Sequence, residues 1–322
     1  MRIYNGSYEL NPGISFHSPK RFYDYKVTEK EVIIYALCLE GYIAEKINGR
    51  ILRYFISSPF PDVLRVQIRY FRPSEIMKFK TATATETLQV EDDDESILIK
   101  SGRLGIEFKK NEWEYSYVSD SILATSGRES AGIVFDENSQ HHITEKLSIG
   151  VGDLVYGMGE RYCPFIKNGQ HIEIFNADAA TESDMGYKNI PFYMTNNGYG
   201  VFVNTPAPVD FEICTEDAHA VRITVPLQEL DYYVLYGPDP KKVISQYTAL
   251  TGRPPLIPKW SFGLWLTTSF TTEYNEEVIT EHIKGMFDRK IPLTVFHFDC
   301  YWMKERHWCN SVSYTHLTLP TN

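Results

Sequence analysis

The sequence lacks the features that would mark a zinc-binding, secreted or membrane-spanning protein. Its five cysteines include no C-x-x-C pair, so we expect no structural zinc site and no other bound metal. Their low, odd number among 322 residues favours reduced thiols and a cytoplasmic location. The first residues contain no apolar core of a secretory signal, and no apolar run reaches about 18 residues. We therefore expect no contact with a membrane.

Basic residues are also in short supply. Lys and Arg number 32 against 42 Asp and Glu, which gives a net charge of −10 and argues against a nucleic-acid partner. We expect no cofactor either. Aromatic residues, in contrast, make up 14% of the chain, with 22 Tyr and 18 Phe. This content suits sugar binding, because rings stack on apolar pyranose faces, but a β-rich fold alone would also explain it.

Residues 1–250 show the period-two pattern of β-strands. Apolar and polar side chains alternate over 64–70, and 97–108 is typical of a hairpin that turns at Ser101-Gly102. Residues 199–204, 221–225 and 231–236 have the same strand character. Many short strands separated by turns predict a mainly β fold, with an N-terminal β-sandwich over 1–250.

The pattern changes in residues 251–310. A proline-rich linker at 254–258 precedes an apolar run at 262–266, which favours a strand buried on both faces. Asn275 is a candidate N-cap for an amphipathic helix, and 292–298 favours a second strand. Strand, helix and strand predict the start of a (β/α)8 barrel, in which chemistry gathers at the carboxyl ends of the strands.

Asp299 follows the second of these strands and is itself followed by Cys300, Tyr301 and Trp302. A carboxylate accepts hydrogen bonds from sugar hydroxyls, and aromatic rings cover apolar sugar faces, so this group suits sugar recognition. The alternative is an Asp that caps the next helix. Asp299 alone does not decide between the two.

Four ordered segments resemble glycoside hydrolase family 31, and most closely its bacterial α-xylosidase branch. They are Tyr156-Gly-Met-Gly-Glu-Arg-Tyr162, Tyr187-Lys-Asn-Ile-Pro-Phe-Tyr-Met-Thr-Asn196, Trp260-Ser-Phe-Gly-Leu-Trp-Leu-Thr-Thr-Ser-Phe-Thr-Thr272 and residues 296–304. The resemblance implies a galactose-mutarotase-like β-sandwich that leads into a catalytic (β/α)8 barrel. It also implies a retaining mechanism with a carboxylate nucleophile and a second carboxylic acid as acid/base. In this family both residues lie on later barrel strands, so no catalytic residue is assigned to this chain.

The resemblance does imply substrate-binding residues. Asp299 matches the Asp that grips the hydroxyls of the non-reducing sugar, and Phe270 matches an aromatic wall of the same pocket. Asp178 matches, more weakly, a sandwich-loop residue at the pocket mouth. Cys300 and Tyr301 stand where related α-glucosidases have Ile and a second Asp, so a ring replaces a carboxylate near the sugar's hydroxymethyl group. A xylosyl unit lacks that group, and xylose is therefore favoured over glucose.

Residues 311–322 do not fit this pattern and resemble one reading frame of a sequencing adapter, although a natural polar tail is the alternative. We expect a non-native tail, and hence an enzyme fragment that binds an oligosaccharide or glycoside but lacks turnover. The parent enzyme would be a glycoside hydrolase, and analogy with its branch favours a homo-oligomer. The alternatives are a non-catalytic carbohydrate-binding sandwich and an aldose mutarotase-like protein. Glu160 and Arg161 are expected to form a structural ion pair.

Overall fold

The computed structural model describes residues 2–4, 9–38, 49–72, 76–127, 129–176, 184, 186–269, 271–272, 274–299 and 302. The chain divides into two compact units, Met1–Arg253 and Pro254–Asn322. Among the described residues, the first unit contains three antiparallel sheets and one helix, and the second contains a parallel strand pair with one helix. No described helix is long and apolar enough to cross a membrane.

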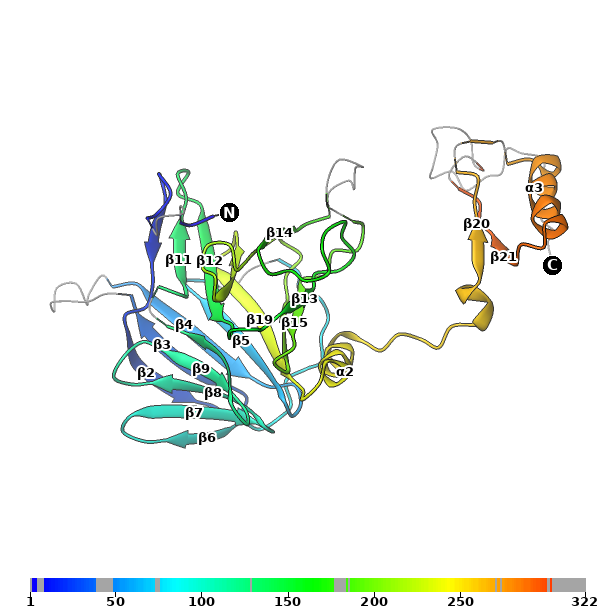
Figure 1. Ribbon diagram of the computed structural model, residues 1–322. Helices are drawn as coiled ribbons and strands as arrows, with labels where there is room; N and C mark the ends of the chain where they lie inside the picture. Colours follow the sequence, from blue (N-terminus) through cyan, green and yellow to red (C-terminus); the bar gives the residue numbers. More distant parts are fainter. Residues whose placement is uncertain are drawn as a thin grey trace. The chain divides into compact units, whose positions relative to one another are not determined.

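Two of the sheets of the first unit have eight and five strands, and Figure 1 labels strands of both. The eight-stranded sheet has the order β13-β15-β16-β19-β5-β4-β3-β2. Its strands are β2 (Arg21–Val27), β3 (Val32–Leu37), β4 (Ile51–Ser57), β5 (Val63–Arg69), β13 (Val155–Gly157), β15 (Phe192–Thr195), β16 (Tyr199–Val203) and β19 (Glu229–Tyr236). The five-stranded sheet has the order β10-β9-β8-β7-β6. Its strands are β6 (Gln89–Asp92), β7 (Ser96–Ser101), β8 (Leu104–Lys109), β9 (Tyr115–Val118) and β10 (Ile122–Ser126).

The third sheet has six strands, in the order β1-β11-β12-β18-β17-β14. They are β1 (Ser15–His17), β11 (Gly132–Phe135), β12 (His141–Ser148), β14 (Gln170–Ile174), β17 (Val209–Ile213) and β18 (Ala220–Val225). One apolar core draws on all three sheets, with fully buried side chains such as Ile34, Ile99 and Ile223. This shared core confirms the predicted β-sandwich. Strands with one apolar face bury that face against another sheet.

The helix α2 (Pro240–Thr251) closes the first unit and was not expected from the sequence. Asp239 caps it through a 3.0 Å hydrogen bond from the Lys242 backbone N–H, and Pro240 occupies the first turn. Val243 and Leu250 pack in a second, smaller apolar cluster with residues of the eight-stranded sheet, Phe202 among them. The helix therefore belongs to the sandwich rather than to the linker.

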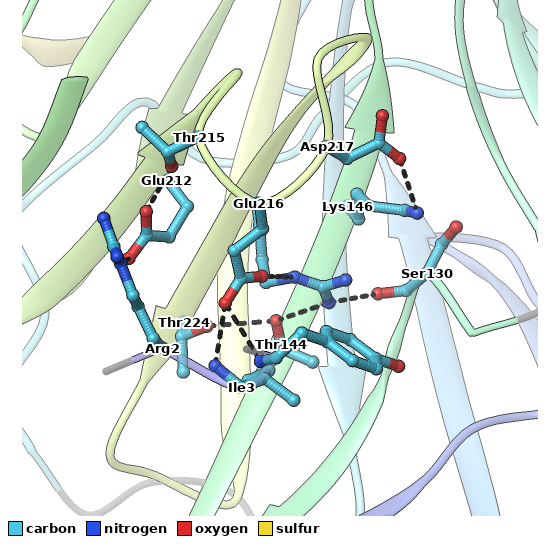
Figure 2. Close-up of polar contacts among 12 residues, drawn as sticks. Arg2, Ile3, Ser130, Thr144, Lys146, Glu212, Thr215, Glu216, Asp217 and Thr224 are labelled. Carbon is cyan, nitrogen blue, oxygen red and sulfur yellow. Dashed lines mark hydrogen bonds and ion pairs between the residues drawn. The ribbon is translucent and has the colours of Figure 1, made fainter. Parts of the chain in front are cut away.

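A buried ion pair ties the N-terminal residues to the six-stranded sheet, as Figure 2 shows. The Glu216 carboxylate accepts hydrogen bonds from the backbone N–H groups of Ile3 at 2.8 Å and Tyr4 at 3.2 Å. Its other oxygen accepts one from Arg222 Nε at 2.8 Å. The side chains of Glu216 and Arg222 are only 6% and 4% exposed, so each needs the other as a compensating charge.

The second unit holds β20 (Leu264–Leu266), α3 (Glu276–Asp288) and β21 (Leu293–Phe296). Asn275 caps α3 by accepting a 2.9 Å hydrogen bond from the Val278 N–H, as predicted. The expected strand at 262–266 is shorter, because residues 259–262 form a 3₁₀ turn. The two strands pair in parallel, which confirms the start of a (β/α)8 barrel after the sandwich. Leu264 and Trp265 are exposed, contrary to the expected burial on both faces.

Candidate functional site

The parallel pairing of β20 and β21 brings two polar segments to one edge. Trp265 pairs with Val295 and Leu266 with Phe296, and the His297 N–H donates a 2.8 Å hydrogen bond to the Leu266 carbonyl. The strands thus end at the same level. Residues 267–269 leave the end of β20 and residues 297–299 leave the end of β21, at the edge where barrel enzymes carry their active sites.

Asp299 lies at this edge and is half-buried. The Ser269 hydroxyl donates a hydrogen bond to Asp299 Oδ2 at 3.3 Å, across the two strand ends. The Trp302 N–H donates to the Asp299 backbone carbonyl at 3.1 Å and begins the next turn. The predicted binding residue therefore contacts a hydroxyl that sequence reasoning left without a role.

Tyr274 also contacts the loop that follows β20, and this role was not predicted from the sequence. Its side chain is fully buried, and its hydroxyl donates to the Ser269 carbonyl at 2.9 Å. The same hydroxyl lies 3.2 Å from Thr267 Oγ1, which can donate to it. The Tyr274 ring packs edge-on against Phe298 at 5.5 Å. In the sequence, Tyr274 is marked only by its place before the N-cap Asn275, and this position does not indicate which residues its hydroxyl contacts.

Two further hydroxyls belong to the same loop. Within the described part of the chain, the hydroxyl oxygens of Thr268 and Thr272 are buried and have no hydrogen-bond partner. Buried hydroxyls normally find a partner, since leaving one unpaired costs about 1–3 kcal/mol. The loop after β20 thus carries more polar groups than its own backbone satisfies.

Of the five predicted site residues, the structure places Asp299. Phe270, Cys300, Tyr301 and Asp178 lie outside the described residues, and their roles stay predictions. The predicted tail at 311–322 also lies outside them. Among the described residues, no cluster of three His, Cys, Asp or Glu side chains could hold a metal ion.

Arg161 holds the base of the sandwich loop that contains Asp178. Its guanidinium binds Asp184 Oδ2 at 3.0 and 3.2 Å and donates to Asn189 Oδ1 at 2.8 Å. It also donates to the Glu173 carbonyl at 3.2 Å, so it joins both sides of the loop. The expected ion pair with Glu160 is wrong, because Glu160 points its carboxylate at Lys188 instead, at 3.3 Å.

Comparison with known proteins agrees with this architecture. The model of the N-terminal galactose mutarotase-like domain of glycosyl hydrolase family 31 matches residues 53–212, and that of the family's TIM-barrel domain matches residues 254–320. The two matched domains, a mutarotase-like sandwich and a TIM barrel, are domains of a glycoside hydrolase. The chain belongs to glycoside hydrolase family 31.

The relatives include several α-xylosidases. The α-xylosidase XylQ of Lactiplantibacillus pentosus is 37% identical over 317 residues, which cover 96% of this chain and 41% of that protein. An α-xylosidase of Emericella nidulans is 48% identical over 194 residues, or 60% of this chain and 24% of that protein. The chain thus spans less than half the length of either relative.

A solved structure shares the fold. A family 31 dextranase of Flavobacterium johnsoniae, complexed with isomaltotriose, superposes with a TM-score of 0.72 at 19% identity. The match covers 90% of this chain and 34% of that one. At this identity the likeness concerns the fold alone.

Proposed function

We propose that this chain is the N-terminal region of a retaining α-glycosidase of the α-xylosidase type, which hydrolyses terminal α-linked sugars. The observation that carries the proposal is the 37% identity to an α-xylosidase across 96% of the chain. Asp299 at the carboxyl edge of the strand pair supports it. Its carboxylate can accept hydrogen bonds from the neutral hydroxyls of the terminal sugar. Such binding requires no cofactor.

The chain by itself should bind rather than hydrolyse. Retaining glycosidases need two carboxyl groups about 5–5.5 Å apart, on opposite sides of the glycosidic bond. A full barrel supplies them from eight strands in about 250 residues. The described residues of the second unit supply β20, α3 and β21 and the single carboxylate of Asp299 at their site edge.

A non-catalytic sugar-binding sandwich and an aldose mutarotase are the competing functions, because both share the sandwich fold and fold alone does not give function. Neither has a use for a parallel strand pair whose carboxyl edge carries an Asp held by a Ser. The xyloside preference, a cytoplasmic location and an oligomeric parent enzyme remain predictions.

Turnover of nitrophenyl glycosides tests the proposal. The purified chain should hydrolyse neither the α-xyloside nor the α-glucoside, whereas the complete enzyme that carries this sequence should hydrolyse the α-xyloside. Hydrolysis by the chain that survives repurification would contradict the inactive-fragment part. A complete enzyme that interconverts sugar anomers but cleaves no glycoside would favour the mutarotase.

A further inference from the structure

We propose that Ser269 and Tyr274 are positioning residues that fix the Asp299 carboxylate for sugar binding. This inference rests on the proposed function. It assigns a task to two residues outside the predicted site, one of them fully buried. Neither is expected to touch the sugar's reacting atoms.

The first support is the direct contact. Ser269 Oγ donates to Asp299 Oδ2 at 3.3 Å, so one oxygen of the carboxylate has a fixed partner from the neighbouring strand end. An ionised carboxylate has about four acceptor positions. The Ser269 hydroxyl occupies one of these positions and orients the carboxylate towards the neighbouring strand end.

The second support is the backbone of Ser269. Its φ of 51° lies in the left-handed region, which residues other than glycine seldom adopt. Such a conformation persists where surrounding contacts impose it, and it is often found at functional sites. Here it turns the chain just after β20 and aims the Ser269 side chain at the end of β21.

The third support is Tyr274, which supplies the imposing contact. Its hydroxyl binds the Ser269 carbonyl at 2.9 Å and Thr267 Oγ1 at 3.2 Å, so it fixes both ends of the turn. Its ring meets Phe298, the residue before Asp299, at 5.5 Å. The buried Tyr274 side chain thus contacts both Ser269, which donates the hydrogen bond, and Phe298, which precedes the acceptor Asp299.

A set of single substitutions in the complete enzyme separates the hydroxyl from the backbone. Ser269→Ala removes the hydroxyl and keeps the Cβ, so the cost of the positive φ stays, whereas Ser269→Gly removes the hydroxyl and also relieves that cost. We expect both variants to lower kcat/KM for the α-xyloside about tenfold, the scale of one lost hydrogen bond to a charged group. Tyr274→Phe should lower it similarly. The matched control is Tyr233→Phe, which removes a hydroxyl that bonds Thr81 in the sandwich and should change little.

A double-mutant cycle tests whether Ser269 acts through Asp299. In an Asp299→Asn background, Ser269→Gly should reduce kcat/KM less than twofold further, because the two changes share one interaction. Full additivity, or full activity of Ser269→Gly beside an inactive Ser269→Ala, would overturn the inference and leave Ser269 a backbone role only.

Failure of the proposed function has a separate signature. If the wild-type enzyme hydrolyses no α-glycoside, the proposed function is wrong whatever the variants do. Crystal structures of Ser269→Gly and Tyr274→Phe then decide the inference. A carboxylate of Asp299 that has rotated from its place in both variants supports it, and one that stays in place overturns it.

Discussion

The Ser126 hydroxyl donates a 2.5 Å hydrogen bond to the carboxylate of Glu145, which is fully buried in the sandwich. The Tyr115 hydroxyl and the Lys146 backbone N–H donate to the same group. Burial nevertheless dominates, because it disfavours the charged form, and it raises the pKa of Glu145 from 4.5 to about 7.

This pKa shift predicts that stability falls as the pH rises towards neutrality. A carboxyl with a raised folded-state pKa binds its proton more tightly in the folded than in the unfolded protein. Its stabilising effect is complete below about 4.5 and is lost as the pH rises through about 7. Glu145→Gln should abolish this dependence. Between pH 5 and 8, wild type should lose on the order of 2–3 kcal/mol relative to the variant. Urea unfolding of a protein ending at Arg253 measures the free energy of unfolding at each pH. Parallel pH profiles of wild type and Glu145→Gln would contradict the prediction.

The Glu216–Arg222 pair predicts a large, localised loss of stability. Glu216→Ala leaves the buried Arg222 charge and two backbone N–H groups without their acceptor. We expect the free energy of unfolding to fall by about 3–5 kcal/mol. Glu160→Ala, which removes an exposed pair with Lys188, should cost less than about 1 kcal/mol. Equal losses in the two variants, measured by urea unfolding, would show that the buried pair has no special role.

The boundary at Arg253 predicts how the chain can be divided. A protein ending at Arg253 keeps α2 and should be soluble and unfold cooperatively, whereas one ending at Tyr236 loses the cover over Phe202 and should not. The full chain exposes Leu256, Phe262 and Trp265, so it should be poorly soluble and be cut first near 254–258. Limited proteolysis with mass spectrometry checks this. If the full chain resists protease as far as Cys309, the second unit is protected and the prediction is wrong.

The predicted specificity residues, Cys300 and Tyr301, can be tested by substitution. In the complete enzyme, Tyr301→Asp combined with Cys300→Ile should shift preference from α-xylosides towards α-glucosides, because opening the pocket restores space and a hydroxyl partner. The readout is the ratio of kcat/KM for the two sugars. An unchanged ratio would remove Tyr301 from the specificity argument.

The fold was largely readable from local patterns. Alternation identified β5, β8 and β19, and an Asn before two Glu residues identified the start of α3. Helix α2 was not predicted, because its half-buried face gives only a weak apolar stripe. Asp239-Pro240 is nevertheless a good helix start. The resemblance supplied Asp299, but the contacts with Ser269 and Tyr274 depend on strand register and on a positive φ at Ser269, which no residue pattern encodes.

Asp299 is the described residue on which the functional account depends. The most direct test measures kcat/KM of the complete enzyme for a nitrophenyl α-xyloside, with wild type and Asp299→Asn side by side. The account predicts efficient hydrolysis by wild type and a loss of about a hundredfold or more in the variant, with the fold unchanged, because several charge-assisted hydrogen bonds to the sugar weaken together. Wild-type activity that survives the substitution, or no α-glycosidase activity in wild type, would contradict it.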